Sequence, residues 1–215
     1  MTGTPPHSPP ASTNPPGPSR SLTGTDLAVL AHALITTRQT ILPRRLQEPG
    51  PTPEQIQAIF EAAAAAPDHG ELLPWRFVVV GAARRSELGA VFAAALRERD
   101  PLASEADCAR AHDKALRGPF LALAIVDLER REPDIPPPER LVSLGAALQN
   151  ALLMAHSLGL ASSLTSGHAM ESLALRQWLA LRPDEHVVCC LNLGTASRSK
   201  PAREHPKVQQ FVTFL

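Results

Sequence analysis

The stretch Ala66-Pro-Asp-His-Gly-Glu-Leu-Leu-Pro-Trp-Arg-Phe-Val-Val-Val80 joins a predicted helix to a predicted strand. Pro67 ends the alanine-rich helix, because proline lacks an N–H and disfavours α geometry in the residue before it. Residues Phe77 to Val80 form a β-branched and aromatic run that is typical of a buried strand. The loop between the two elements carries His69 and Trp75, and binding groups often lie on loops held by rigid elements. We therefore expect this loop to contribute to a ligand site.

The composition describes a soluble domain with a full core and no charge bias. The chain has 215 residues, 44% hydrophobic and 20% charged, which suits one ordinary domain. Its formal net charge is zero, so no electrostatic field recruits nucleic acid or an anionic membrane. The three cysteines include the adjacent pair Cys189 and Cys190 and cannot form a disulfide framework, which indicates a cytoplasmic protein. The first 25 residues lack the apolar core of a signal peptide, and the most apolar long stretch, Leu141 to Leu158, is too polar to span a bilayer.

The familiar short motifs of catalysis are absent from the sequence. Tyrosine does not occur, and there is no glycine-rich dinucleotide loop, Walker loop, His-Glu-x-x-His or Gly-x-Ser-x-Gly. Cys108 and His112 have a spacing that metal ligands can use, but no second pair accompanies them. We therefore predict neither a side-chain catalyst nor a metal site.

Helices and strands alternate along most of the chain. Residues 1–24 are rich in Pro, Ser, Thr and Gly and are predicted to be a disordered tail, followed by a single domain over residues 25–215. Hydrophobic spacing and capping residues predict helices near 27–36, 53–66, 84–99, 141–158 and 173–181, and strands near 77–80, 120–126, 160–165, 186–193 and 211–215. The first helix carries an apolar face of Leu27, Leu30, Ala31, Leu34 and Ile35, and Thr52 with Gln55 predicts a capping box at the start of the second. Residues 100–118 are polar and alanine-rich and are predicted to be helical in part. This order predicts an α+β or α/β sheet with helices around it, and the helix from Leu141 to Leu158 is the most buried.

A possible anion site follows the first of these helices. Arg38 lies beside the hydroxyls of Thr37 and Thr40, and a guanidinium with nearby hydroxyls suits a phosphate or a carboxylate. The alternative is that Arg38 caps the C-terminus of the helix and interacts with its dipole. The local sequence does not choose between these two roles.

Several stretches together resemble the FMN-dependent nitroreductase family, in particular its small, minimal NAD(P)H nitroreductases. They occur in the family order over about residues 27 to 215 and are Thr37-Arg-Gln-Thr40, Glu48-Pro-Gly-Pro-Thr52, Ala66-Pro-Asp-His69, Pro74-Trp-Arg-Phe77, the long helix, Gly159 to Gly167, Leu193-Gly-Thr195 and Phe211-Val-Thr-Phe214. The resemblance implies a three-layer α/β/α sandwich, with a mostly antiparallel sheet, a long buried helix and a swapped or docked C-terminal strand. It also implies a homodimer with FMN at the subunit interface. Hydride transfer would be ping-pong, from NAD(P)H to FMN and then to a nitroaromatic, quinone or related acceptor.

The resemblance also assigns roles to single residues. The predicted cofactor-binding residues are Arg38, Gln39 and Thr40, which replace a family Arg-Arg-Ser; His69; Leu73, where a glutamine is common; Leu164, Thr165 and Ser166, which replace Trp-Arg-Ser; and Arg198 or Lys200 as a phosphate cation. Trp75 is expected to anchor the loop. No side chain is predicted to be catalytic, because the flavin carries the chemistry.

Three departures from the family pattern leave the function open. Gln39 and Thr165 stand at family arginine positions and Leu73 at a glutamine position, so weaker FMN binding is expected. The alternative function is a flavin-poor or non-enzymatic dimeric binding or regulatory protein of the same fold. The choice between NADH and NADPH is open too, since the 2′-phosphate needs a cation and Arg44, Arg45 and Arg203 are all eligible.

Overall fold

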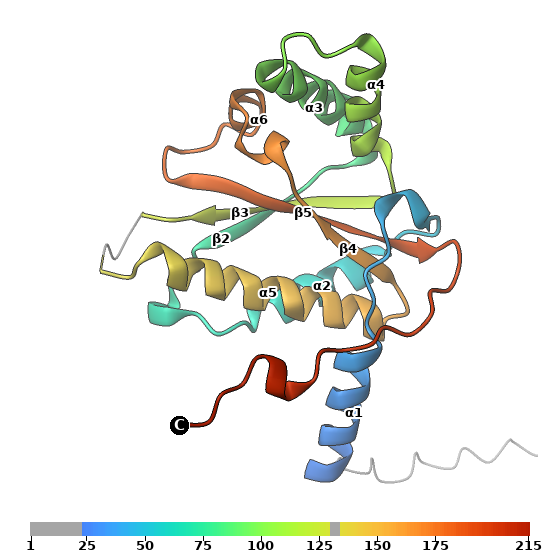
Figure 1. Ribbon diagram of the computed structural model, residues 1–215, viewed down its shortest axis with the longest axis vertical. Helices are drawn as coiled ribbons and strands as arrows, with labels where there is room; N and C mark the ends of the chain where they lie inside the picture. The colour runs from blue at the N-terminus through green and yellow to red at the C-terminus, as the bar shows by residue number, and fades with distance from the viewer. Residues whose placement is uncertain (1–22, 130–133) are drawn as a thin grey trace, which may run out of the picture.

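The computed structural model describes residues 23–129 and 134–215, and most of the predicted tail, residues 1–22, lies outside them. The described chain has three layers (Figure 1). Helices α2 (Pro53–Ala64) and α5 (Pro137–Ser157) cover one face of the sheet, and α3 (Arg85–Arg99), α4 (Glu105–Asp113) and α6 (Leu173–Trp178) cover the other. The prediction of an α+β, three-layer sandwich is therefore confirmed.

The sheet is built around its longest strand. Its strands are β1 (Leu46–Gln47), β2 (Trp75–Val79), β3 (Phe120–Asp127), β4 (Ala161–Thr165) and β5 (Glu185–Ala196). The order is β1-β5-β3-β2, β4 also pairs with β5, and every one of these pairings is antiparallel. Seven of the eight residues of β3 are buried, as expected for a strand with helices on both faces.

Small residues let α5 lie close against the sheet. Ala147, Ala151 and Ala155 are fully buried on this helix, together with Leu144. They share one apolar cluster with residues of β3, β5 and α2. The predicted long buried helix is confirmed, although it begins four residues earlier than expected because proline suits the first turn of a helix.

The N-terminal helix is longer than predicted and lies exposed. Helix α1 (Gly24–Thr37) starts at a capping box in which the Thr23 and Asp26 side chains each accept from the other's backbone N–H, so Gly24 belongs to the helix and not to the tail. None of its residues is buried, and Leu27, Leu30 and Ile35 of its predicted apolar face are more than half exposed.

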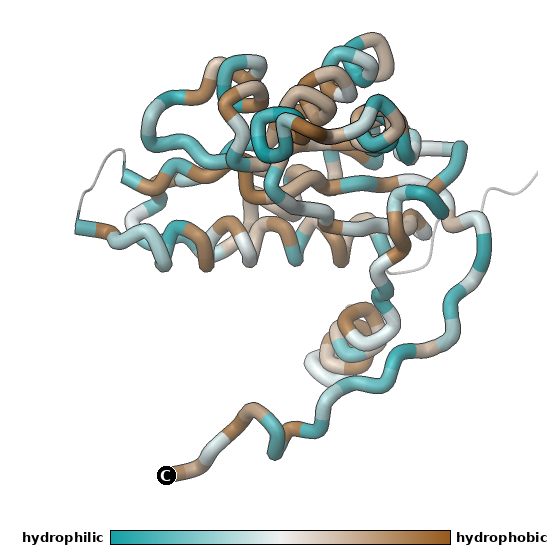
Figure 2. The backbone as a smooth tube through the Cα atoms, turned by 45° about the horizontal axis from the view of Figure 1, so that its top comes forward, coloured by the Kyte–Doolittle hydropathy of each residue, from teal (hydrophilic) through white to brown (hydrophobic). Residues whose placement is uncertain are grey.

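The predicted C-terminal strand is wrong for the single chain. Residues 211–215 form no strand and are exposed, after the short 3-10 turn Val208–Gln210. A strand needs a neighbour to pair with, and no described strand lies beside this segment. Helix α1 and the C-terminal segment instead project together from the layered body (Figure 2). The Nε2 atom of His205 lies 3.1 Å from the Thr36 carbonyl oxygen and joins the two.

Two smaller elements were not predicted as such. Strand β1 has only two residues, too short for any periodic pattern. Helix α4 lies in a polar stretch for which the sequence indicates only partial helix. A search of the described helices finds none with the length and apolar character that crossing a bilayer requires.

Candidate functional site

The first group of predicted site residues lies along the edge of β4. Thr40 forms a parallel bridge with Ser162, and the Ile41 N–H donates to the Ser162 carbonyl over 2.9 Å. The Lys200 ammonium donates to the Thr40 carbonyl over 3.4 Å. We call Arg38–Thr40, Leu164–Ser166 and Lys200 the β4-edge group. Three separate predicted segments thus meet at one strand.

The structure shows the surroundings of the predicted cations. The Lys200 ammonium reaches Thr40, whereas the Arg198 side chain forms no hydrogen bond or ion pair within the described residues. Arg38 is the C-cap residue of α1 and its guanidinium forms no hydrogen bond in that part of the chain, so both roles expected for it stay predictions. The Gln39 amide donates to the Pro201 carbonyl over 3.0 Å. Arg38, Arg198 and Lys200 stay the predicted cations for a phosphate at this edge.

The end of β4 is a firmly held turn. The Thr165 hydroxyl accepts from the Asn192 amide over 3.1 Å, and the Ser166 hydroxyl donates to the Val188 carbonyl over 2.8 Å. Gly167 follows with φ of 142°, a conformation that residues with a side chain rarely adopt. Ser163, on the same face of the strand as Thr165, has a buried hydroxyl oxygen without a hydrogen-bond partner in the described chain.

A cavity of about 670 Å³ opens at this turn, on the face of the sheet that carries α3 and α4. Thr165, Ser166 and Gly167 line it, together with Cys190 and Asn192 of β5. Its size is in the range of small-molecule and cofactor sites. Burial raises the pKa of the Cys190 thiol to about 12, so this cysteine stays protonated and is no nucleophile at neutral pH. The structure thus offers a binding cavity at the end of β4.

The second group lies on the opening loop, residues 66–74. The His69 Nδ1 atom is 2.6 Å from Glu139 Oε2 on the first turn of α5. The Leu73 N–H donates to Asp68 Oδ2 over 2.5 Å, which leaves the Leu73 side chain 62% exposed. Trp75 is buried in the core, and this supports the anchoring role predicted for it. His69 and Leu73 thus face outward from a loop that is fixed at its base.

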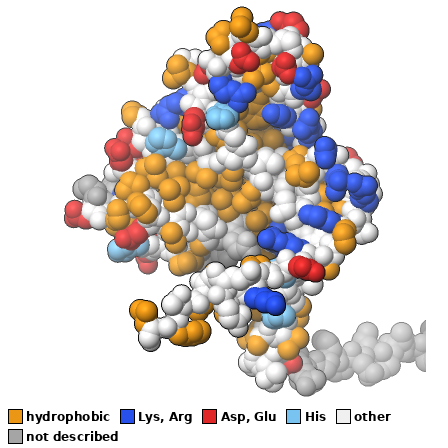
Figure 3. Space-filling model, in the orientation of Figure 1, with side chains coloured by type: hydrophobic (Ala, Val, Ile, Leu, Met, Phe, Trp, Pro, Cys, Tyr) orange, Lys and Arg blue, Asp and Glu red, His pale blue; other side chains and the backbone are white. Residues whose placement is uncertain are grey.

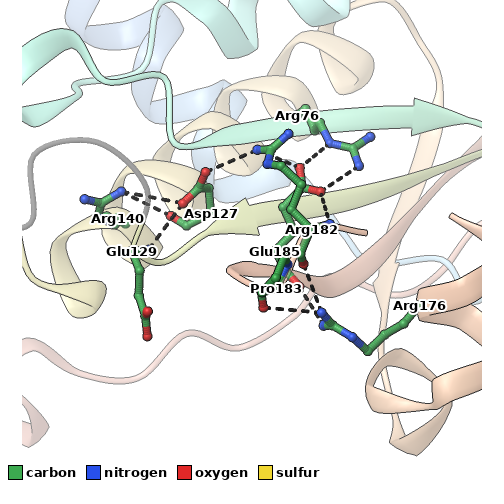
Figure 4. A network of polar contacts seen from close by, with 8 residues as sticks. All are labelled: Arg76, Asp127, Glu129, Arg140, Arg176, Arg182, Pro183 and Glu185. Carbon is green, nitrogen blue, oxygen red and sulfur yellow. Dashed lines mark hydrogen bonds and ion pairs between the residues drawn. The ribbon is translucent and has the colours of Figure 1, made fainter. Parts of the chain in front are cut away.

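A network of charged residues fixes that base (Figure 4). Arg76 at the start of β2 donates to Glu185 Oε1 over 2.6 Å and to Oε2 over 3.1 Å. Arg182 lies 3.0 Å from Glu185 and 3.2 Å from Asp127, to which the buried Arg140 also bonds. The Arg76 hydrogen bonds hold the pKa of Glu185 below its usual value, against the opposing effect of burial. The network encloses a cavity of about 130 Å³ against the loop, and it explains how the loop is positioned.

One chain does not bring the two groups together. The Thr37 hydroxyl, next to the β4-edge group, lies 2.9 Å from His156 in the last turn of α5, whereas His69 contacts Glu139 in the first turn. These two α5 residues are 17 positions apart, which at 1.5 Å a residue separates them by about 25 Å. Figure 1 shows the loop after α2 and helix α1 at opposite ends of α5.

Sequence reasoning missed the cations that line the cavity. Arg99 belongs to α3, and Arg110, Lys114 and Arg117 come from α4 and the turn after it. The spacing of the last three, four and then three residues, places them on one side of a helix and could have indicated a basic stripe. Cys108 and His112 show no metal-binding partners, since no cluster of three potential ligands occurs between residues 23–129 or 134–215.

Known proteins resemble this chain over most of its length. The Nitroreductase family model matches residues 35–195. A Haemophilus influenzae protein with the provisional name NAD(P)H nitroreductase is 31% identical over 187 residues, which are 86% of this chain and 99% of that protein. Among solved structures, a nitroreductase-like family protein from Bacillus cereus has a TM-score of 0.74 at 16% identity, over 92% of this chain and 98% of that one. The FMN-dependent nitroreductase NfnB from Mycobacterium smegmatis, solved in complex with NADPH, has a TM-score of 0.69 at 17% identity, over 88% of this chain and 100% of that one.

Proposed function

The chain belongs to the nitroreductase family, and on that premise we propose that it is an FMN-dependent NAD(P)H oxidoreductase that acts as a homodimer. The name of the Haemophilus influenzae relative supports NAD(P)H as the electron donor. FMN is supported by the description of NfnB and by that of a Desulfitobacterium hafniense nitroreductase with bound FMN. A cytoplasmic location is part of this proposal.

The observation that carries the proposal is the separation of the two residue groups along α5. At each end of α5 a single chain provides only one of the two groups: the β4-edge group at one end and the His69 loop at the other. A two-fold axis that passes near the middle of α5, at right angles to the helix, exchanges its two ends. Such an axis would place the loop of one subunit beside the β4 edge of the other. The FMN site is then completed by the partner.

Exposed apolar surface supports the same assembly. Hydrophobic side chains gather over α5 on the face seen in Figure 3. Val142 of this helix is 71% exposed. Helix α1 also exposes its leucines, and the C-terminal segment exposes Phe211 and Phe214. Large contiguous apolar surfaces are unusual on monomers and typical of interfaces. We infer that a second copy covers all three.

The residues of the β4-edge group suit FMN. Arg38 and Lys200 would hold its phosphate, Thr40 offers a hydroxyl, and the turn at Ser166 and Gly167 would position the ring. Bound FMN would supply the hydride chemistry, accepting a hydride from NAD(P)H and passing it to a nitroaromatic, quinone or related acceptor. The chain itself binds, orients and shields the reactants, in a ping-pong order that lets donor and acceptor use one cavity in turn.

The test is the visible absorption spectrum of the protein after incubation with FMN and desalting. We expect a retained flavin band that NADH or NADPH bleaches in the absence of air and that a quinone restores. A protein that retains no flavin would overturn the enzyme proposal. It would favour the dimeric binding protein instead. The observation that supports this alternative is that the Gln39 and Thr165 side chains already form hydrogen bonds within the chain.

A further inference from the structure

The cavity beside β4 carries an excess of positive charge that the chain as a whole lacks. Five cationic side chains line it, against one carboxylate. They are Arg44, Arg99, Arg110, Lys114 and Arg117, and the carboxylate is Asp107, which already bonds Ser104 and Arg110. Four positive charges are left uncompensated in a protein whose formal net charge is zero. Lys and Arg side chains form a band down the right side of the molecule from α4 (Figure 3).

Four of these five cationic side chains form no polar interaction within the described chain. Arg44, Arg99, Lys114 and Arg117 make no side-chain hydrogen bond or ion pair there, whereas neighbouring Arg97 pairs with Glu105 over 2.5 Å. Glu98 of α3 and Glu105 of α4 do not pair with these cations. Glu98 accepts from the N-terminal amides of α6, and Glu98 and Glu105 line a separate groove. Mutual repulsion makes four unpaired cations around one cavity unfavourable, unless an anion occupies it.

Much of the remaining cavity wall is apolar. Phe92 and Leu96 of α3, Leu121 of β3 and Met170 line it, beside the polar residues at the end of β4. A cavity with an apolar floor and a cationic rim suits an organic molecule that has a flat body and several negative charges. A single carboxylate would balance one cation and leave the others unpaired. The pyrophosphate and 2′-phosphate of NADPH together carry roughly three to four negative charges at neutral pH.

We propose that Arg99, Lys114 and Arg117, together with Arg44, bind the phosphate groups of NADPH and make the protein selective for NADPH over NADH. This inference rests on the proposed function, whose electron donor it specifies. It selects Arg44 from the three cations eligible by sequence, because Arg45 and Arg203 do not line the cavity. It also gives the α3–α4 pair a role in recognising the donor.

The first test is steady-state kinetics of an Arg99→Gln/Arg117→Gln double variant with NADPH and with NADH. Because the two guanidinium groups would form charge-assisted hydrogen bonds with the phosphates, we expect KM for NADPH to rise about tenfold or more, with a smaller change for NADH. The FMN dissociation constant, from flavin fluorescence, should not change. An Arg45→Gln/Arg203→Gln double variant is the matched control, since it also removes two positive charges, neither of which lines the cavity. An unchanged KM for NADPH, or a loss of FMN binding in the double variant, would overturn the inference.

The second test needs no turnover. Calorimetry should detect binding of adenosine 2′,5′-bisphosphate to the purified protein, weaker binding of adenosine 5′-monophosphate, and loss of the difference in the double variant. Equal binding of the two nucleotides would contradict the inference even if the protein retains FMN and oxidises NADPH. If 4-nitrobenzoate loses affinity in the double variant while NADPH does not, the cations serve an anionic acceptor and the inference is wrong. A protein that binds the bisphosphate selectively but retains no FMN would instead refute the proposed function.

Discussion

Glu185 is the residue on which the charged network around the opening loop depends. Its carboxylate is almost fully buried at the start of β5 and is bonded by Arg76, by the Arg182 guanidinium and by the Arg182 backbone N–H over 3.0 Å. The bond between Glu185 and Arg76 could not be predicted from sequence, because the two residues are 109 positions apart. A buried charge is tolerated only when such bonds satisfy it.

Replacement of Glu185 by Gln should destabilise the protein at neutral pH. Because Arg76 is partly exposed and water screens its charge, we expect a loss of about 1–3 kcal/mol in the free energy of unfolding. The lowered pKa of Glu185 means that its contribution is complete above the pKa of the unfolded state and is lost as the pH falls through the lower, folded value. Urea denaturation of wild type and variant should therefore converge as the pH is lowered from 7 to 3.

The matched control is Glu105→Gln, which removes a carboxylate from an exposed pair with Arg97 and should change the free energy of unfolding little. Equal stability of wild type and Glu185→Gln at pH 7 would show that the network does not stabilise the fold.

At the level of elements, the sequence predicts those that bury a periodic face within one chain. Helix α5 and strand β5 follow from long apolar patterns, and the capping box at Thr52 marks the start of α2 correctly. Two predictions differ from the structure for one reason. The apolar stripe of α1 and the apolar C-terminus were expected to be covered, and nothing in the described chain covers them. Hydrophobic pattern shows that a face is to be buried, but not against which molecule.

The C-terminal segment should contribute to dimerisation through its aromatic side chains. Phe211 is 68% exposed and Phe214 is 89% exposed in the single chain, and burial of a phenylalanine contributes about 1.5–3 kcal/mol. A Phe211→Ser/Phe214→Ser variant should therefore dissociate at a protein concentration at which the wild type is dimeric, as measured by sedimentation velocity.

Leu102 provides the control for that measurement. It is 93% exposed in the turn between α3 and α4, away from the surfaces proposed to pair, so Leu102→Ser should leave the assembly unchanged. If the double variant sediments as the wild type does, the segment has no part in the interface.

For the whole molecule, sequence order could not reveal the division of the site. Thr40 and Lys200 are 160 positions apart in the chain and meet beside β4, whose last residue is Thr165, and the family resemblance assigns all three to one site together with Arg38. The same resemblance added His69 and Leu73, which the fold keeps about 25 Å away along α5. The roles of all these residues toward FMN stay predictions. The geometry makes them testable, because it predicts that each FMN site combines residues of two subunits.

Mixed dimers test that division directly. Arg38→Ala and His69→Ala should each impair both sites of a homodimer, the first through the phosphate and the second through the loop supplied by the partner. In a heterodimer of the two variants, purified through two different affinity tags, one site receives both substitutions and the other receives neither. We expect about half of the wild-type activity and one tightly bound FMN per dimer, because the unaltered site combines Arg38 of one subunit with His69 of its partner.

If both residues served the same subunit's site, each site would carry one substitution and the heterodimer would remain as impaired as the two homodimers. A His69→Ala homodimer with full activity and FMN content would remove the loop from the site altogether.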